Sequence, residues 1–490
     1  MTSRYLISGK KDDYEVVIGC EIHAQVASES KLFSSSKVQF GGVPNQFASF
    51  VDVAMPGMLP TINQKCVEQA VRTGLAINAK INLTSYFDRK NYFYPDLPQG
   101  YQISQFFVPI VEGGEVLIEL ESGETKNIRI ERIHLEQDAG KLIHDHHPNY
   151  SLVDLNRAGV PLMEIVSKPD LNSPEEAATY VKTIRSILRA IGSSDADMEK
   201  GNLRCDANVS VRKVGDPKLG TRCEIKNLNS TRNIARAIVF EAQRQVELIE
   251  NGGVVVQETR LFDANSGETA TMRSKEDAMD YRYFPDPDLP PLNITQDFVD
   301  KIRLELPELP AVKKSRYINH YKLNQEEVAV LLDDLAIAEF FEKVILRNIE
   351  AKLAVTWLNV ELLGRLNKQN IAFDQMPISL DNFVELLQLI TQKTISAKTA
   401  KEIFDLMFSS GKNPKKIVSE MGLEQVSDES PIVDAINKVL DLNQDSLAEY
   451  FSGKEKLFAF FIGQIMKETR GKANPAMVND LLKKEIDKRK

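Results

Sequence analysis

The stretch Arg132-Ile133-His134-Leu135-Glu136-Gln137-Asp138-Ala139-Gly140-Lys141 concentrates acids, an imidazole and an amine beside a glycine that frees the backbone. A surface loop can hold such side chains in water, so the stretch alone does not identify a site. Three other segments of the same half of the chain are acid-rich or carry histidine, and we interpret them as strands or strand ends. They are Gly19 to His23, Asp154 to Glu164 and Met198 to Asp206. We therefore predict that these segments converge on one site.

Alternation of apolar and polar residues predicts several half-buried strands. Val16 to His23 places Glu21 and His23 on one polar face, and Leu203 to Arg212 alternates in the same way. Thr221 to Lys226 resumes the alternation after a loop with glycine and proline, which predicts a hairpin with one charged floor. Such a floor can simply face solvent or can carry ligands. A second hairpin, predicted over residues 116–130, leads into the Glu136 segment.

Helical signals separate the two halves of the chain. Packing helices are predicted from residue 66 to 79, after the capping sequence at Ser173, and after Ser230. The proline-rich segments from Asp280 to Pro291 and from Pro307 to Pro310 mark a boundary, because proline cannot continue a helix or a central strand. The remaining residues have helical periodicity throughout, and they predict two all-helical modules that divide near residue 411.

Composition limits the class of protein. The chain has 490 residues and a net charge of −9, which argues against a protein that coats nucleic acid. The last forty residues nevertheless carry ten Lys and Arg against five Asp and Glu, so any RNA contact is expected there. Four cysteines without a CxxC pair predict neither a zinc site nor a disulfide framework. The longest apolar run, Leu457 to Ile462, is too short for a membrane span, and we expect a soluble cytoplasmic protein.

The chemistry indicated by the residues is metal-assisted. The sequence contains no GxxxxGK[ST], GxGxxG or HExxH motif, which removes the commonest nucleotide and zinc interpretations. Many carboxylates remain, with His23, His134 and the cations Lys90, Arg157 and Arg204. This set suits magnesium-assisted phosphoryl transfer, and a metal hydrolase would use much the same ligands. Sequence spacing does not choose between the two.

The chain resembles the B subunits of aspartyl/glutamyl-tRNA amidotransferases over nearly its whole length. The matching segments are Gly19 to His23, Lys31 to Ser34, Phe87 to Asp96 with Tyr101 to Gln105, His134 to Lys141, Asp154 to Asp170, Leu203 to Asn208, Glu224 to Ser230, Asp280 to Pro291, Gly463 to Lys467 and Gly471 to Pro475. So many long segments in the same order make the resemblance specific.

The resemblance implies an ATP-dependent carbon–nitrogen ligase with glutamine as amido donor. Such an enzyme phosphorylates the side-chain carboxylate of glutamate or aspartate misacylated on tRNA, and then displaces phosphate with ammonia. The implied cofactors are ATP and Mg²⁺, and the implied partners are a glutaminase (amidase) subunit, a small third subunit and the misacylated tRNA. The implied fold is α+β. A mixed cradle domain with a mainly antiparallel sheet covers residues 1–293, an all-α domain covers 294–410, and a small helical tail that binds tRNA covers 411–490.

Site residues follow from the same resemblance. We expect Glu21, His23, Glu136 and Glu199 to hold the metal, and Lys90 to line the ammonia route. The expected catalytic set is Lys90, Glu136, Asp138, Arg157, Glu164, Arg204 and Asp206, and the expected ATP contacts are Lys31, Ser34 and Arg204. Many relatives have leucine in place of Cys20 and glutamate in place of Gln137. Compared with glutamate, the Gln137 amide can still form hydrogen bonds but carries no charge.

Two other classes fit parts of the sequence. A non-catalytic tRNA-binding scaffold would use the basic tail, and its acid clusters would be structural. A free-standing carboxylate–amine ligase acting on a small molecule would have no evident use for the tail. Hydrolysis of ATP that depends on tRNA excludes the scaffold, and deletion of the tail separates the two enzymes.

Overall fold

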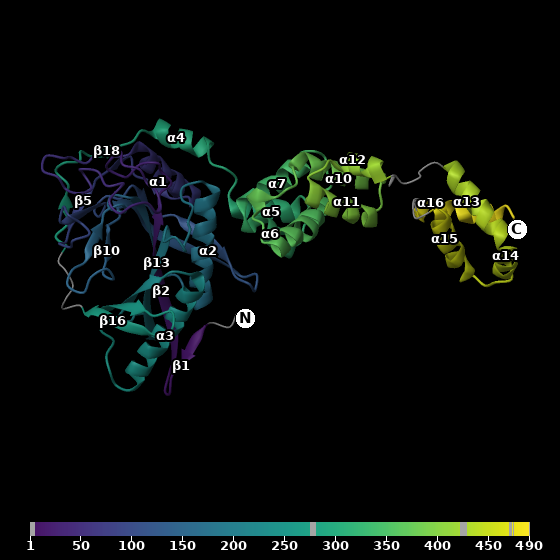
Figure 1. Ribbon diagram of the computed structural model, residues 1–490. Coiled ribbons are helices and arrows are strands. Elements are labelled where there is room, and N and C mark those ends of the chain that lie inside the picture. The colour runs from purple at the N-terminus through teal and green to yellow at the C-terminus, as the bar shows by residue number, and fades with distance from the viewer. Residues whose placement is uncertain (1–4, 275–280, 422–428, 470–472, 474, 490) are drawn as a thin grey trace. The chain divides into compact units, whose positions relative to one another are not determined.

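The computed structural model describes residues 5–489 except 275–280, 422–428, 470–472 and 474. Asp280 and residues 471, 472 and 474 of the family-like segments therefore lie outside the described residues. The chain divides into two compact units, Met1–Pro310 and Ala311–Lys490, which are described separately (Figure 1). No described helix is long and apolar enough to cross a membrane.

An eleven-stranded sheet forms the first unit. Its order is β16 (Thr269–Ser274), β15 (Glu258–Phe262), β14 (Cys223–Leu228), β13 (Leu203–Lys213), β2 (Asp13–Gln25), β12 (Pro161–Ser167), β9 (Thr125–Gln137), β7 (Val111–Glu112) and β3 (Lys80–Ile81), with β1 (Leu6–Ser8) on β2 and β8 (Glu115–Glu119) on β9. Among these described strands only β14 and β15 pair in parallel. The predicted α+β fold with a mainly antiparallel sheet is confirmed, and so are both predicted hairpins, β13–β14 and β8–β9.

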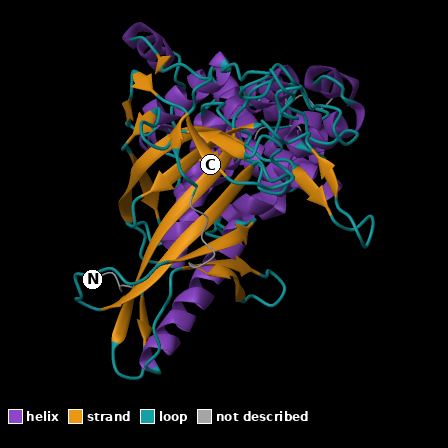
Figure 2. Cartoon of the chain, turned by 90° about the vertical axis from the view of Figure 1, so that its left-hand side faces the viewer, coloured by secondary structure: helices purple, strands orange, loops and turns teal. Residues whose placement is uncertain are grey.

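The two faces of this sheet differ because side chains alternate along each strand. On β2, Val16, Ile18, Cys20 and Ile22 are buried in the core, and Glu21 and His23 point to the opposite face. Helices α1 (Gln64–Ala76), α2 (Pro174–Ala190) and α3 (Thr231–Glu250) cover the apolar face (Figure 2). Ser173 and Ser230 cap α2 and α3 with their side chains, as the sequence predicts.

Register brings the polar side chains of distant segments together. Glu164 on β12 lies opposite His23 on β2 and opposite His134 on β9. Glu21 and His23 lie opposite Asp206 and Arg204 of β13. One face of the central strands is therefore lined with ionisable side chains from segments that are far apart in the sequence.

Small sheets complete the first unit. The strands β17 (Phe284–Pro285), β5 (Asp88–Asn91) and β6 (Tyr101–Ser104) form one of them, in that order. The Ser104 hydroxyl donates to Glu136 Oε2 over 3.3 Å, so this small sheet lies against the polar face of the large one. The pairs β10 (Lys141–Ile143) with β11 (Leu152–Asp154), and β4 (Thr84–Ser85) with β18 (Leu292–Asn293), are separate two-stranded sheets.

The hydrophobic cores of the structure continue past residues 293 and 410, which are the predicted ends of the first two domains. Helix α4 (Gln296–Leu304) buries Val299 and Ile302 in the first core, so this unit extends to Pro310 instead of ending at residue 293. In the second unit, Ile417 and Val418 of α12 belong to the same core as the preceding helices, so that core continues past residue 410. A separate core forms after residues 422–428, around Ile436, Phe461 and Leu482.

The second unit is entirely helical over its described residues, as predicted. Its helices are α5 (Pro310–Asn319), α6 (Gln325–Asp333), α7 (Leu335–Ile345), α8 (Ala351–Thr356), the π-helical η2 (Trp357–Leu362), α9 (Leu363–Gln369), the short η3 (Phe373–Gln375), α10 (Leu380–Thr391), α11 (Ala397–Ser410), α12 (Pro414–Met421), α13 (Glu429–Leu442), α14 (Gln444–Phe451), α15 (Leu457–Glu468) and α16 (Pro475–Asp487).

Candidate functional site

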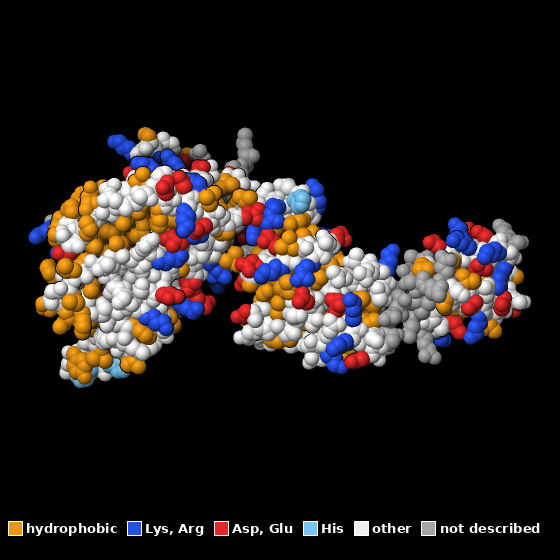
Figure 3. Space-filling view, turned by 90° about the horizontal axis from the view of Figure 1, so that it is seen from above, with side chains coloured by type: hydrophobic (Ala, Val, Ile, Leu, Met, Phe, Trp, Pro, Cys, Tyr) orange, Lys and Arg blue, Asp and Glu red, His pale blue; other side chains and the backbone are white. Residues whose placement is uncertain are grey.

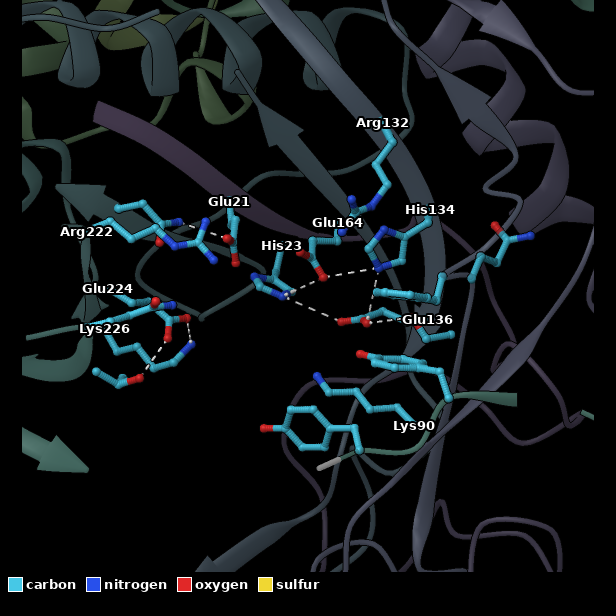
Figure 4. Close-up of a pocket in the computed structure, with 18 of the residues that line it drawn as sticks. Glu21, His23, Lys90, Arg132, His134, Glu136, Glu164, Arg222, Glu224 and Lys226 are labelled. Carbon is cyan, nitrogen blue, oxygen red and sulfur yellow. Dashed lines mark hydrogen bonds and ion pairs between the residues drawn. The ribbon is translucent and has the colours of Figure 1, made fainter. Parts of the chain in front are cut away.

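A pocket of about 420 Å³ lies between the polar face of the large sheet and the small sheet that carries Lys90 (Figure 4). Strands β9, β12, β2, β13, β14 and β15 all contribute side chains to it. Its lining is Glu21, His23, Lys90, Ser104, Gln105, Phe106, Arg132, His134, Glu136, Glu164, Asn208, Arg222, Glu224, Lys226, Gln257, Glu258, Thr259, Tyr281 and Tyr283. The predicted convergence of the Gly19–His23 and Arg132–Lys141 segments is thus observed.

Two histidines and two glutamates form the centre of the pocket. His23 Nε2 lies 3.6 Å from Glu136 Oε1 and 3.5 Å from Glu164 Oε2. His134 Nε2 lies 3.5 Å from Glu136 Oε2 and 3.1 Å from Glu164 Oε2. Each carboxylate therefore faces both imidazoles, an arrangement that three adjacent antiparallel strands create by their register.

The electrostatics of this cluster follow from the pairing. Burial lowers the pKa of His134, but Glu164 and Glu136 outweigh burial and raise this pKa to about 9. Burial raises the pKa of Glu164, but the two histidines outweigh that effect and hold this pKa well below its usual value. Without a cation, the protonated His134 thus offsets part of the carboxylate charge. A bound metal ion would supply positive charge in its place.

The donor set fits a divalent cation. His23, Glu136 and Glu164 each offer one ligand atom, and these atoms all lie within 4.8 Å of one another. Two carboxylates suit Mg²⁺ or Mn²⁺, and one imidazole is compatible with either. Glu21 lines the pocket outside this group and accepts a hydrogen bond from Asn208 Nδ2 at 2.8 Å. Glu199, a predicted ligand, is exposed in a turn away from the pocket lining.

Lys90 faces the cluster from the small sheet. Its ammonium lies 4.8 Å from the centre of the Tyr281 ring. Burial lowers the pKa of Lys90, but Glu136 and neighbouring groups outweigh burial and raise this pKa. The side chain therefore stays a cation beside the carboxylates. Tyr283 stacks on Phe106 at 4.1 Å between ring centres, and the two rings form an aromatic wall of the pocket.

A hydrogen-bonded group occupies the other end of the pocket. Lys226 Nζ lies 2.6 Å from Asp206 Oδ2 and 2.8 Å from Glu224 Oε1. The Thr259 hydroxyl donates to Glu224 Oε2 at 2.9 Å. This is the charged floor predicted for the β13–β14 hairpin, and here it faces a pocket rather than open solvent. Asp206 braces Lys226 and is not itself part of the lining.

Three of the predicted catalytic residues form a separate cluster. Arg157 binds Asp138 Oδ2 through Nε at 3.0 Å and Nη2 at 2.6 Å. Arg204 Nη2 donates to Asp138 Oδ1 at 3.2 Å. None of the three lines the pocket. Both arginines are thus engaged with one carboxylate, and this cluster braces the end of β9.

The predicted ATP contacts Lys31 and Ser34 also lie elsewhere. Lys31 is fully buried, and its ammonium binds Asp52 Oδ2 at 2.8 Å and the Leu155 carbonyl at 3.4 Å. The Ser34 hydroxyl lies 3.5 Å from Asp52 Oδ1. An alanine at position 159 would place its Cβ 2.5 Å from Asp52, so glycine is required beside this pair. The group joins the residues 30–60 to the loop before β12.

Several lining residues are missing from the predicted set. Arg132 shares a face of β9 with the predicted Glu136, so alternation along this strand was a usable signal. Arg222 and Glu224 belong to the charged floor that alternation predicts for residues 221–226, but they were not included in the predicted site. Tyr281 and Tyr283 come from the segment before β17. The periodicity of this segment indicates only a boundary, although the segment from Asp280 to Pro291 is one of those that carry the family resemblance.

Comparison with known proteins gives matches over both units. The family model described as "GatB/GatE catalytic domain" matches residues 16–300, and the model described as "GatB domain" matches residues 339–486. The chain is 56% identical to the B subunit of the aspartyl/glutamyl-tRNA(Asn/Gln) amidotransferase from Rickettsia canadensis (strain McKiel), over 98% of this chain and 99% of that one. It is 55% identical to the proteins of the same name from Rickettsia africae (strain ESF-5) and Rickettsia conorii (strain ATCC VR-613 / Malish 7), with the same coverage.

Proposed function

The chain belongs to the family of aspartyl/glutamyl-tRNA(Asn/Gln) amidotransferase B subunits, and we propose on this basis that it carries out ATP-dependent transamidation of misacylated tRNA. The substrate is Glu-tRNA(Gln), Asp-tRNA(Asn) or both. The observation that carries the proposal is the His23–Glu136–Glu164 cluster at the centre of a pocket lined with carboxylates and cations. Its surroundings suit phosphoryl transfer, in which charged oxygens must be positioned and neutralised.

The proposed reaction has two steps. In the first, an oxygen of the substrate side-chain carboxylate attacks the γ-phosphorus of ATP, and ADP leaves. In the second, ammonia attacks the carbonyl carbon of the acyl phosphate, and phosphate leaves with the former carboxylate oxygen. A magnesium ion held by His23, Glu136 and Glu164 would neutralise phosphate charge during the first step. Lys90 keeps its positive charge beside the carboxylates of Glu136 and Glu164.

The chain's own residues support an external source of ammonia. Glutamine hydrolysis requires an activated nucleophile, and all four cysteines are buried. Burial raises the pKa of both Cys66 and Cys223 to about 12, so these two thiols are protonated at neutral pH. We therefore propose that a separate glutaminase supplies the ammonia, and that a small third protein completes the complex.

Exposed apolar side chains on the first unit support the docking of these partners. Between residues 40 and 59, an irregular segment exposes Phe40, Val43, Phe50, Met55, Met58 and Leu59. Wide apolar areas are visible on the surface of this unit in Figure 3. Large apolar patches of this kind mark protein interfaces more often than free surface.

ATP hydrolysis by the complex with and without Glu-tRNA(Gln) or Asp-tRNA(Asn) tests the proposal. We expect hydrolysis to require a misacylated tRNA, and amide product to form with either ammonium or glutamine. The isolated chain should use ammonium alone. Lys90→Ala is expected to impair glutamine-driven amidation more than tRNA-dependent ATP hydrolysis. Hydrolysis independent of tRNA would contradict transamidation, and glutaminase activity in the isolated chain would contradict the division of labour.

A further inference from the structure

Arg132 occupies a distinctive place in the pocket. It lies on β9 two residues before His134 and four before Glu136, so all three side chains share one face of the strand. All three line the pocket, and Figure 4 shows Arg132 on the same strand as His134, next to the carboxylate–imidazole cluster. Its neighbours across the sheet are Glu112 of β7 and Val166 of β12.

Arg132 has no partner among the described residues. Its Nε is buried and makes no hydrogen bond, and its guanidinium forms no ion pair with a described carboxylate. Several other long cations on this face form ion pairs. Arg204 binds Asp138, Lys226 binds Asp206 and Glu224, and Arg212 binds Glu15 at 3.0 Å. The Nε of Arg204 is also buried without a hydrogen bond, but its Nη2 binds Asp138. Arg132 therefore differs from these neighbours in combining an unsatisfied buried Nε with a guanidinium that pairs with no carboxylate in the described part of the chain.

An unpaired buried guanidinium donor is unfavourable, since its loss of hydration is not compensated. The guanidinium is also a planar fork that matches the two oxygens of a carboxylate or phosphate. From these observations we infer that Arg132 binds an oxyanion of a reactant. The identity of the reactant rests on the proposed function: the oxyanion is either the terminal phosphate of ATP or the side-chain carboxylate of the aminoacyl group.

The neighbours of Arg132 agree with this role. Glu136 and Glu164 face the histidines rather than Arg132, so neither of these two acids competes for the guanidinium. The side chain starts from the strand that supplies two members of the central cluster, and a strand rises about 3.4 Å per residue. An oxyanion bound by Arg132 would thus lie beside the cluster where phosphoryl transfer is proposed.

The test uses the complete complex and three variants. Arg132→Ala removes the fork, and Arg132→Lys keeps the charge but not the planar geometry. Arg129→Ala is the matched control, because Arg129 lies on the same strand and pairs with Asp170 at the surface, at 2.6 Å. The probes are inorganic tripolyphosphate, which reports on phosphate binding, and the ratio of affinities for Glu-tRNA and Gln-tRNA, which reports on carboxylate binding.

If the phosphate is the ligand, Arg132→Ala weakens tripolyphosphate binding about ten- to a hundredfold and leaves the Glu-tRNA to Gln-tRNA ratio unchanged. If the carboxylate is the ligand, the ratio falls towards one and tripolyphosphate binding is unchanged. In either case, Arg132→Lys should show most of the loss expected for Arg132→Ala. If the alanine variant does not fold, the lysine variant is measured with the same two probes. Wild-type values for both probes in both Arg132 variants, or equal losses in Arg129→Ala, would overturn the inference. A wild-type complex that does not transamidate tRNA would refute the proposed function. The tripolyphosphate measurement would still test whether Arg132 binds an oxyanion.

Discussion

Replacing Lys31 by methionine decides between two roles for this lysine, contact with ATP or fastening of the fold. The ammonium and the Asp52 carboxylate are 2.8 Å apart, and both side chains are almost completely buried. In Lys31→Met, Asp52 keeps its hydrogen bond from the Ser49 amide, at 2.7 Å, but loses its counter-charge. Removing one partner of a buried ion pair typically destabilises a protein by about 3–5 kcal/mol. Methionine is similar in length to the lysine stem, so little of this loss would come from a cavity.

The loss should first affect the segment that the pair holds in place. Residues 38–63 contain no helix or strand, so we expect faster proteolysis there together with a lower urea midpoint. The double variant Lys31→Met, Asp52→Asn removes both charges and is expected to recover most of the stability. KM for ATP should change little in either variant that remains folded. Wild-type proteolysis and unfolding in Lys31→Met, combined with a raised KM for ATP, would refute the fastening role and favour ATP contact.

Three further predictions concern the central cluster, the tail and acid stability. Glu136→Ala should abolish tRNA-dependent ATP hydrolysis and leave tRNA binding nearly intact, whereas the exposed Glu199→Gln should change neither; equal losses of hydrolysis would contradict the cluster. Truncation before residue 422 should weaken tRNA binding and reduce its salt dependence in filter-binding titrations, because fewer counterions are released; an unchanged slope would argue against a tRNA-binding tail. For Glu241, burial raises the pKa, but hydrogen bonds from Arg244 and Gln245 outweigh burial and lower this pKa below 4.5. Its stabilisation is therefore present above about pH 4.5 and is lost as the pH falls further, so Glu241→Gln should flatten the decline of Tm in that range; an unchanged decline would show that other groups cause it.

Local alternation accounts for what the sequence predicts well. It places Glu21 and His23 on one face of β2, and Arg204 and Asp206 on one face of β13, and the structure has both arrangements. Alternation is a property of each strand by itself, because successive side chains point to opposite sides. The same rule would have included Arg132 in the predicted site, because Arg132 lies on the same face of β9 as His134 and Glu136.

Register and burial account for what the sequence does not predict. Glu164 joins the cluster in place of Glu199 because β12 pairs with both β2 and β9, and no local pattern specifies that pairing. Arg157 and Arg204 were expected at the reaction centre, but both turn to Asp138. Lys31 is buried although lysine is usually exposed, because its partner Asp52 lies in a segment whose folding has no periodic signal.

The central place of β2 has a consequence for how the chain is made. This strand is the first long element to leave the ribosome, yet the two strands that flank it begin at Pro161 and Leu203. At about 5–20 residues per second, the roughly 136 residues between Gln25 and Pro161 take roughly 7 to 30 s to synthesise. During this interval, β1 can pair only with Asp13–Glu15 of this thirteen-residue strand, and the rest of both edges is unpaired beside an apolar face. Such unpaired edges are prone to pairing with another chain. Production of the protein should therefore depend on chaperones that hold the nascent N-terminal segment until β12 and β13 emerge.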